Sequence, residues 1–280
     1  MKTILLLALG AIFVVAFNVN YANAAVVTKA FKGDLLEGSR KIVLTFDDGP
    51  GTYDTLCENY VVERYPDYEV SKSTTENLLN VLDRYGKELS SKGKIEATFF
   101  IRGDHFMARE AISKLVLARG HTLGNHSYSH KNSLAYTEEK DFLEEFIRTH
   151  ELVRKRLNYQ MTVLRPPFGV WSDRLTELFA NHPQLNLYHP PIMWNIDSFD
   201  FLYKHECNVD VIFSNAMGRT YLQQGGVVLF HDIHAVSVAA LNQYLSWFAE
   251  ENRKISQSRY NRGPKWEIIP LHQALKEYQN

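Results

Sequence analysis

Short apolar segments alternate with longer amphipathic segments along most of this chain. The short segments predict buried strands, and apolar residues spaced three or four apart predict helices that pack on one face. The predicted strands are residues 41–46, 97–101, 122–125, 162–164, 192–196, 226–230 and 266–269. The predicted helices are residues 75–89, 108–119, 137–157, 172–180, 210–222, 236–250 and a last segment that begins at Leu271. Strands that alternate with helices run parallel and are joined by crossovers, so the pattern predicts an α/β fold.

The number of units favours a closed barrel. About seven strand and helix pairs fit a (β/α) barrel better than an open sheet, and a barrel gathers its functional loops at the C-terminal ends of the strands. An open doubly wound sheet is the alternative, but its usual G-x-G-x-x-G phosphate signature is absent. No linker-like stretch or internal repeat divides the 280 residues. We therefore expect one domain.

The first residues have the pattern of a signal peptide. Lys2 precedes an apolar run at residues 4–17, and Ala22, Asn23 and Ala24 form the small-x-small pattern of a cleavage site. The run is shorter than the roughly 20 residues that span a bilayer, so a retained anchor is the weaker alternative. We expect residues 1–24 to be removed and residues 25–280 to act in the periplasm or outside the cell, without a membrane span.

Charge and cysteine content narrow the possible partners and the compartment. With 31 basic and 32 acidic residues the formal net charge is −1, so no overall attraction to nucleic acid is expected. The two cysteines, Cys57 and Cys207, can form a disulfide in an oxidising compartment. Two unpaired buried thiols are the alternative, because separation in sequence does not give separation in space.

Acidic and histidine side chains at predicted strand ends indicate a metal site. Asp47 and Asp48 are adjacent, and two such carboxylates repel each other unless a cation or a proton is shared. His126 and His130 are four residues apart, a spacing that puts both rings on one side of a helical turn. Two histidines and one carboxylate leave open positions on a metal ion, as a catalytic site requires.

Three further segments at strand ends contain candidate catalytic groups. Arg165 begins an R-P-P-F-G segment in which the prolines fix the backbone, so its guanidinium can hold a carboxylate, although a surface turn is the alternative. The segment Asp197-Ser-Phe-Asp200 and His231 follow neighbouring strands. A carboxylate beside an imidazole favours the protonated ring that a general acid needs. The alternative is a structural hydrogen bond at the barrel rim.

Five segments in this order resemble the ordered motifs of the NodB-homology polysaccharide deacetylases, carbohydrate esterase family four. They are T-F-D-D-G-P at residues 45–50, H-S-Y-S-H at 126–130, R-P-P-F-G at 165–169, D-S-F-D-F at 197–201 and L-F-H at 229–231. The resemblance extends over about residues 41–272, and it includes A-T-F-F at residues 97–100 and Gly120-His121.

The resemblance implies a distorted barrel and a set of roles. Asp47 would be the general base and Arg165 its tether, and Asp197 would tune His231 as the general acid. The residues that would bind one divalent metal, usually zinc with cobalt or nickel able to substitute, are Asp48, His126 and His130. The reaction implied is hydrolysis of the acetamide on an N-acetylated amino sugar, with the oxyanion near the backbone N–H of Phe168.

Aromatic residues near these motifs are candidates for substrate binding. Phe168 lies within the R-P-P-F-G segment, and Trp171, just after it, is the expected sugar-stacking platform. Phe201 stands where the family commonly has tryptophan, which keeps an apolar wall but removes an indole N–H. The segment 53–72 is longer than the family's usual link, and we consider both a cover for the substrate groove and a solvated surface insertion.

An exported catalytic domain without a separate carbohydrate-binding module meets peptidoglycan first, so the leading hypothesis is peptidoglycan N-deacetylation. The second hypothesis is an O-acetyl esterase that acts on a plant polymer such as xylan. A catalytically silent glycan-binding module is the third, and the complete set of acidic, histidine and arginine residues argues against it.

Overall fold

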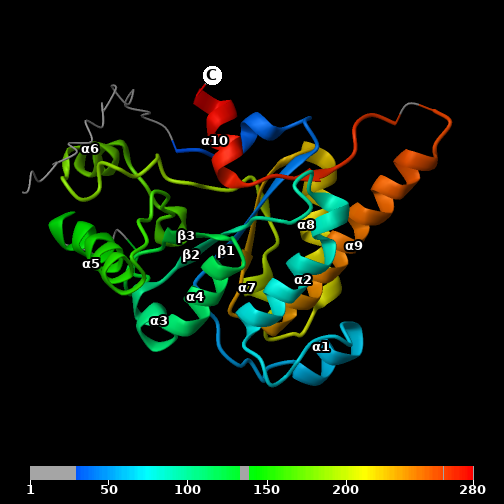
Figure 1. The fold of residues 1–280 in the computed structure, drawn as a ribbon, viewed down its shortest axis with the longest axis horizontal. Helices are drawn as coiled ribbons and strands as arrows, with labels where there is room; N and C mark the ends of the chain where they lie inside the picture. The colour runs from blue at the N-terminus through cyan, green and yellow to red at the C-terminus, as the bar shows by residue number, and fades with distance from the viewer. Residues whose placement is uncertain (1–29, 133–138, 261, 280) are drawn as a thin grey trace, which may run out of the picture.

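A parallel sheet forms the centre of the molecule (Figure 1). The computed structural model describes residues 30–132, 139–260 and 262–279, so the expected signal peptide and the predicted start of helix 137–157 lie outside the described residues. The strands are β1 (Lys41–Asp47), β2 (Thr98–Ile101), β3 (Thr122–Asn125), β4 (Ile196–Asp197), β5 (Gly226–His231) and β6 (Glu267–Ile268). All strand pairs among the described residues are parallel, which confirms the α/β class.

The sheet curves into a distorted barrel around β1. The strand order is β3-β2-β1-β5-β4, and β6 pairs with the first residues of β1. Beyond β3, Asn125 forms a single bridge with Leu164, whose carbonyl accepts a hydrogen bond from Ile192 N at 2.9 Å. The segment that starts at Ile192 continues into β4, so backbone hydrogen bonds run around the whole ring. The expected barrel is confirmed, with six strands in the described residues rather than about seven.

The predicted strand 162–164 is reduced to an isolated bridge at Leu164, and the strand predicted at 192–196 joins the sheet ladder only at its end, where β4 begins at Ile196. Leu164 precedes Arg165-Pro166-Pro167, and Ile192 follows Pro190-Pro191. Proline has no N–H to donate, so a hydrogen-bonded ladder cannot extend through these positions. Between β3 and β4 the barrel is therefore held by a few single backbone hydrogen bonds and not by a continuous ladder.

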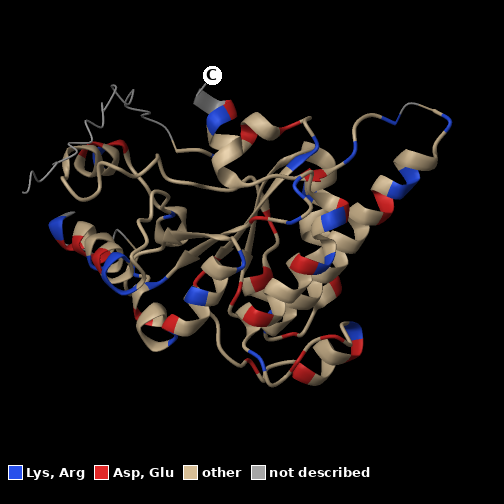
Figure 2. Cartoon of the chain, in the orientation of Figure 1, with Lys and Arg blue, Asp and Glu red and all other residues tan. Residues whose placement is uncertain are grey.

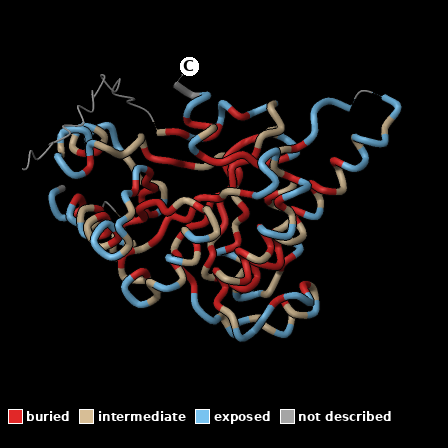
Figure 3. The backbone as a smooth tube through the Cα atoms, in the orientation of Figure 1, coloured by how far each residue is buried: buried red, intermediate tan, exposed pale blue. Residues whose placement is uncertain are grey.

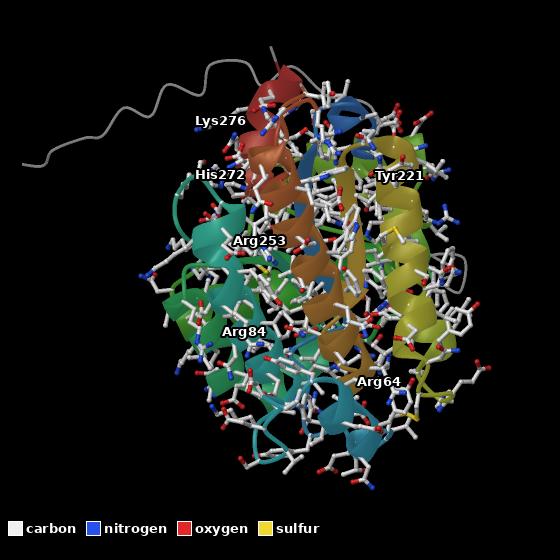
Figure 4. All side chains as sticks on the ribbon, turned by 90° about the vertical axis from the view of Figure 1, so that its right-hand side faces the viewer. Arg64, Arg84, Tyr221, Arg253, His272 and Lys276 are labelled. Atoms are coloured by element: carbon white, nitrogen blue, oxygen red, sulfur yellow. A yellow bond between two sulfur atoms is a disulfide. The ribbon has the colours of Figure 1, made fainter. Side chains whose placement is uncertain are left out.

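The helices pack outside the barrel. They are α1 (Glu58–Arg64), α2 (Thr74–Leu89), α3 (Gly103–Ala108), α4 (Glu110–Ala118), α5 (Glu139–Leu157), α6 (Asp173–Asn181), α7 (Asp200–Tyr203), α8 (Val209–Gln223), α9 (Ala235–Gln257) and α10 (Leu271–Gln279), with short 3-10 turns at Asp34–Leu36 and Pro167–Gly169. Figure 4 shows α9 between α2 and α8 on one side of the molecule. A helix flanked by two others must be apolar on several faces, and α9 accordingly buries twelve side chains.

The core lies between the strands and these helices (Figure 3). All residues of β1 after Lys41 are buried, as a strand covered on both faces requires. Helix α2 begins with a capping box, in which Ser73 and Glu76 satisfy each other's backbone N–H groups, and buries its apolar residues against α9. These contacts fix the ends of β1 and β5, where the polar motifs lie.

The segment 53–72 is a packed part of the fold. It forms α1, and the side chains of Val61, Tyr65 and Tyr68 are buried in the core. Cys57 and Cys207 form the predicted disulfide, with 5.3 Å between their Cα atoms. The alternative of a solvated surface insertion is therefore wrong for these buried side chains, although Tyr53, Leu56 and Val70 of the same segment are exposed.

The two ends of the barrel are covered differently. Helix α10 closes the end where the strands begin, and Lys41 at the start of β1 bonds Glu277 of that helix. Helix α1 lies at the opposite side of the view from α10 (Figure 1). Basic and acidic residues are interspersed on the outer helices (Figure 2). Among the described residues, none of the helices has the length and apolar character needed to cross a membrane.

Candidate active site

Asp47 ends β1 and is held by a buried arginine. Arg165 is fully buried, and its Nη1 donates to Asp47 Oδ1 at 2.7 Å and to Thr45 Oγ1 at 2.9 Å. The other guanidinium nitrogens donate to the carbonyls of Ile192 and Met193, so the side chain has one possible orientation. The alternative interpretation of Arg165, a residue of a surface turn, is therefore wrong. Arg165 leaves Asp47 Oδ2 free, and this oxygen lies 3.6 Å from His126 Nε2.

Asp48, His126 and His130 bring three potential metal-binding atoms together, all within 4.8 Å of one another. Asp48 Oδ1 lies 3.6 Å from His126 Nε2 and 3.2 Å from His130 Nε2. This oxygen is buried and has no hydrogen-bond partner among the described residues. A buried carboxylate oxygen without a partner is costly, so the arrangement suits a bound cation.

The protonation of the two rings also suits a metal. His126 Nδ1 lies 2.7 Å from the carbonyl oxygen of Arg165, which only accepts, so the proton is on Nδ1 and Nε2 presents its lone pair. Burial lowers the pKa of His130 to about 4, more strongly than the neighbouring Asp48 carboxylate raises it. Neutral imidazoles and a carboxylate form the mixed nitrogen and oxygen set that zinc accepts.

The H-S-Y-S-H segment is a loop and not the helical turn expected from its spacing. Ser127 and His130 both have positive φ, 65° and 59°. Side chains hold the loop instead: Asn125 Oδ1 accepts from Ser127 N, and Glu145 of α5 accepts from Ser129 N and Oγ. The two rings meet because the loop folds back, with ring centroids 5.0 Å apart.

His231 ends β5 beside Asp47 in the strand register. Its Nδ1 lies 2.7 Å from Asp200 Oδ1, and Asp200 is fully buried and also accepts from Ser237. Burial lowers the pKa of His231, but the carboxylates of Asp200, Asp48 and Asp47, with Asp200 contributing most, together raise this pKa to about 10. In return, His231 overcomes the effect of burial on Asp200 and lowers its pKa to about 2. The ring is therefore protonated at neutral pH.

The predicted partner of His231 was the wrong aspartate of its segment. Asp197 lies opposite Leu229 in the β4–β5 register, and its carboxylate accepts from Trp194 Nε1 and Phe199 N. Phe199 has φ 55°, so the chain turns there and α7 begins at Asp200, which reaches His231. The sequence did contain the correct residue, because Asp200 is the second aspartate of the same D-S-F-D segment.

The three predicted substrate-binding aromatics have different surroundings. Phe168 is 61% exposed with its ring 4.7 Å from that of His130, and Phe201 is 41% exposed with its ring 5.7 Å from that of His231. Phe168 therefore lies next to the cluster of Asp48, His126 and His130, and Phe201 lies next to His231. Trp171 instead donates to Thr176 and packs against Phe179 in a separate core cluster, a placement that does not support its expected role as an open platform.

Sequence comparison matches this chain to a known family and to named relatives. The family described as "Polysaccharide deacetylase" matches residues 37–184, just over half of the chain. The peptidoglycan-N-acetylglucosamine deacetylase PgdA of Listeria monocytogenes is 27% identical over 209 residues, 74% of this chain and 36% of that protein. The peptidoglycan-N-acetylmuramic acid deacetylase PdaC of Bacillus subtilis is 24% identical over 225 residues, 80% of this chain and 39% of that protein. The chain thus spans a little over a third of the length of these curated relatives.

Solved structures share the fold. The structure of PdaC from Bacillus subtilis superposes with a TM-score of 0.60 at 21% identity, covering 88% of this chain and 93% of that one. A structure from Bacillus anthracis described as a pseudoenzyme of the same esterase family superposes with a TM-score of 0.56 at 20% identity, covering 84% and 65% of the two chains. The likeness to these structures supports the distorted barrel.

Proposed function

Because the chain belongs to the polysaccharide deacetylase family, we propose that it is a metal-dependent hydrolase that removes acetyl groups from N-acetylated amino sugars of peptidoglycan. The observation that supports this most strongly is the convergence of three groups at one barrel end. These are the cluster of Asp48, His126 and His130, the Arg165-bound Asp47 and the Asp200-bound His231. The names of the relatives support peptidoglycan as the polymer.

The side chains divide the hydrolysis between them. Asp48, His126 and His130 would hold a divalent cation, zinc most favourably, whose chemistry at this position is Lewis-acid polarisation of the acetamide carbonyl. Asp47, fixed by Arg165, accepts a proton from the water that attacks the carbonyl carbon. A backbone N–H near Phe168 donates to the oxyanion.

His231 completes the reaction on the leaving group. Its pKa of about 10 keeps the ring protonated at neutral pH, so it can donate a proton to the amine nitrogen as the C–N bond breaks. Asp200 keeps Nδ1 as a donor and so directs Nε2 to the substrate side. The products are acetate and a free amino sugar. Phe168 and Phe201 would form the apolar walls beside the sugar.

The test is product analysis on purified peptidoglycan. The protein with added zinc should release acetate, and mass spectrometry of the digested glycan should show sugars lighter by one acetyl group. Comparing the glucosamine and muramic acid positions identifies the sugar, because the two relatives differ in the sugar that they are named for. Acetate release from acetylated xylan but not from peptidoglycan would favour the esterase reading, and glycan binding without acetate release would favour a silent module.

Export of the chain is part of the same proposal. The disulfide between Cys57 and Cys207 supports it, because such bonds persist in oxidising compartments. N-terminal sequencing of protein recovered from outside the cytoplasm should begin at Ala25. A chain that retains residues 1–24 there would contradict the expected cleavage.

A further inference from the structure

The backbone that carries Asp48 is held by donors from one short segment. Three consecutive carbonyls of the Asp-Gly-Pro turn each accept a hydrogen bond from residues 102–109. The pairs are His105 Nδ1 to Asp48 O at 2.7 Å, Arg102 N to Gly49 O at 3.0 Å and Arg109 Nη1 to Pro50 O at 3.1 Å.

The same segment also holds the loop that carries the two histidines. Gly103 N donates to Ser127 O and Asp104 N donates to Tyr128 O, both at 3.0 Å. A side chain at Gly103 would meet the Tyr128 ring at 2.4 Å, so the ring packs directly against the backbone at this glycine. The start of α3 therefore lies between the loop of Asp48 and the loop of His126 and His130, and bonds both.

The Asp48 turn lies just after the last residue of β1. Asp48 has φ 70°, and Pro50 has no N–H, so no regular ladder continues through the turn. One side of the turn is filled, because a side chain at Gly49 would meet the Asp232 carboxylate oxygens at 2.3 Å. The turn is therefore packed against Asp232 on one side and hydrogen bonded to the α3 segment on the other, where His105 and Arg109 are the side-chain donors.

His105 is itself held in place. Its backbone N–H donates to Asp104 Oδ1, and Asp104 forms two hydrogen bonds with Arg102. Because the Asp48 carbonyl only accepts, the His105 ring must carry its proton on Nδ1. The contact is therefore a directed hydrogen bond from Nδ1 of a residue whose backbone is held by Asp104.

We propose that the start of α3 sets the distance between the two metal-binding loops, and that His105 and Arg109 are positioning residues for the metal. The inference rests on the metal site of the proposed function. Residues that orient metal ligands through hydrogen bonds typically change metal affinity by about 10- to 100-fold when they are removed. A donor lost at His105 frees the Asp48 carbonyl, and the attached carboxylate then has to be ordered when the metal binds.

The experiment compares donor and non-donor side chains of similar size. His105→Leu removes the donor, whereas His105→Asn keeps an N–H near the position of Nδ1; Arg109→Met and Arg109→Lys form the second pair. Met107→Ala, an exposed position of the same helix, is the control. The zinc dissociation constant of each purified metal-free protein is measured by competition with a chromophoric chelator, and the unfolding midpoint is measured without metal.

The expected result is a zinc affinity about 10- to 100-fold weaker in His105→Leu, recovered largely in His105→Asn, with metal-free midpoints that stay close to wild type. Arg109→Met should weaken affinity and Arg109→Lys should restore part of it. Equal zinc affinity in His105→Leu and wild type would overturn the inference, and so would equal losses in the Leu and Asn variants. Because zinc binding is measured directly, a wild type that binds zinc but releases no acetate would overturn the proposed function and leave this inference standing.

Discussion

Asp47 and Asp48 are adjacent in the chain but face different partners. Asp47 is the last residue of β1 and points to Arg165, whereas Asp48 adopts a positive φ and turns its carboxylate toward His126 and His130. One oxygen of Asp48 has no hydrogen-bond partner among the described residues, while Oδ1 of Asp47 is bound to a buried guanidinium. The geometry therefore supports the proposed division of roles, with Asp48 as a metal ligand and Asp47 as the proton acceptor.

The two aspartates should respond differently to the same substitution. Asp47→Asn removes the proton acceptor but leaves the three metal-binding side chains, so turnover should fall by roughly 10²- to 10⁴-fold while zinc remains bound. Asp48→Asn should lose zinc as well as activity. Metal content by mass spectrometry beside the acetate release rate measures both effects. Loss of zinc from Asp47→Asn, or full activity in that variant, would show that the roles are assigned wrongly.

The sequence did not decide which aspartate, Asp197 or Asp200, binds His231. The D-S-F-D segment correctly predicted an Asp–His pair at neighbouring strand ends, but either aspartate satisfied the pattern. The left-handed conformation of Phe199 decides between them, because it ends β4 and starts α7 so that Asp200 reaches His231. No sequence pattern in the segment predicts a positive φ at Phe199, because phenylalanine rarely adopts this conformation.

The pH dependence of activity should identify the true partner. Asp200 raises the pKa of His231 to about 10, so activity that needs the protonated ring should persist at alkaline pH and decline as pH rises through this value. Asp200→Asn removes the negative charge that raises the pKa of His231, so burial lowers this pKa. The loss of activity should then occur at lower pH. Asp197→Asn should leave it nearly in place. The profile of kcat/KM against pH decides, and a larger shift in Asp197→Asn would contradict the structure.

At the scale of elements, the long amphipathic helices and the buried strands were predicted well, and the irregular pieces were not. Helix α2 lies one residue from its prediction, since its apolar spacing and its capping residues agree. The H-S-Y-S-H segment was predicted as helical because i and i+4 positions share a helix face, but contacts with α5 fold it as a loop. Those contacts join residues far apart in sequence, which no local pattern contains.

The disulfide connects two elements beside the site. Cys57 precedes α1, and Cys207 lies shortly after α7, which begins with Asp200. The bond closes a loop across 150 positions, and the chain-entropy model gives an upper value of about 5 kcal/mol for its effect on the free energy of unfolding. A Cys57→Ser, Cys207→Ser double variant should be less stable in urea by up to this amount. Alkylation of two thiols in unreduced protein from an oxidising compartment would contradict the pairing.

At the scale of the whole molecule, the barrel explains why residues spread from Asp47 to His231 form one site. Parallel strands deliver their C-terminal ends to one end of the barrel, so motifs that follow strands meet there whatever their distance in sequence. This is why the sequence predicted the location of the site. The contacts between elements that set the distances, above all Arg165 to Asp47 and α3 to both metal-binding loops, come from the closed fold and were outside the reach of strand and helix patterns.

Metal binding should couple to the stability of this whole fold, because the ligands come from loops after β1 and β3 that only the folded barrel brings together. A ligand that binds the folded state alone stabilises it by about 2.7 kcal/mol at a free concentration 100-fold above its dissociation constant. The unfolding midpoint of wild type should therefore rise with free zinc and fall with a chelator, and activity should disappear with the chelator and return with zinc, cobalt or nickel. Asp47→Asn should show the same rise, whereas Asp48→Asn should show little. Thermal unfolding at a series of buffered zinc concentrations measures this, and a wild-type midpoint that does not depend on zinc in active protein would exclude the proposed metal site.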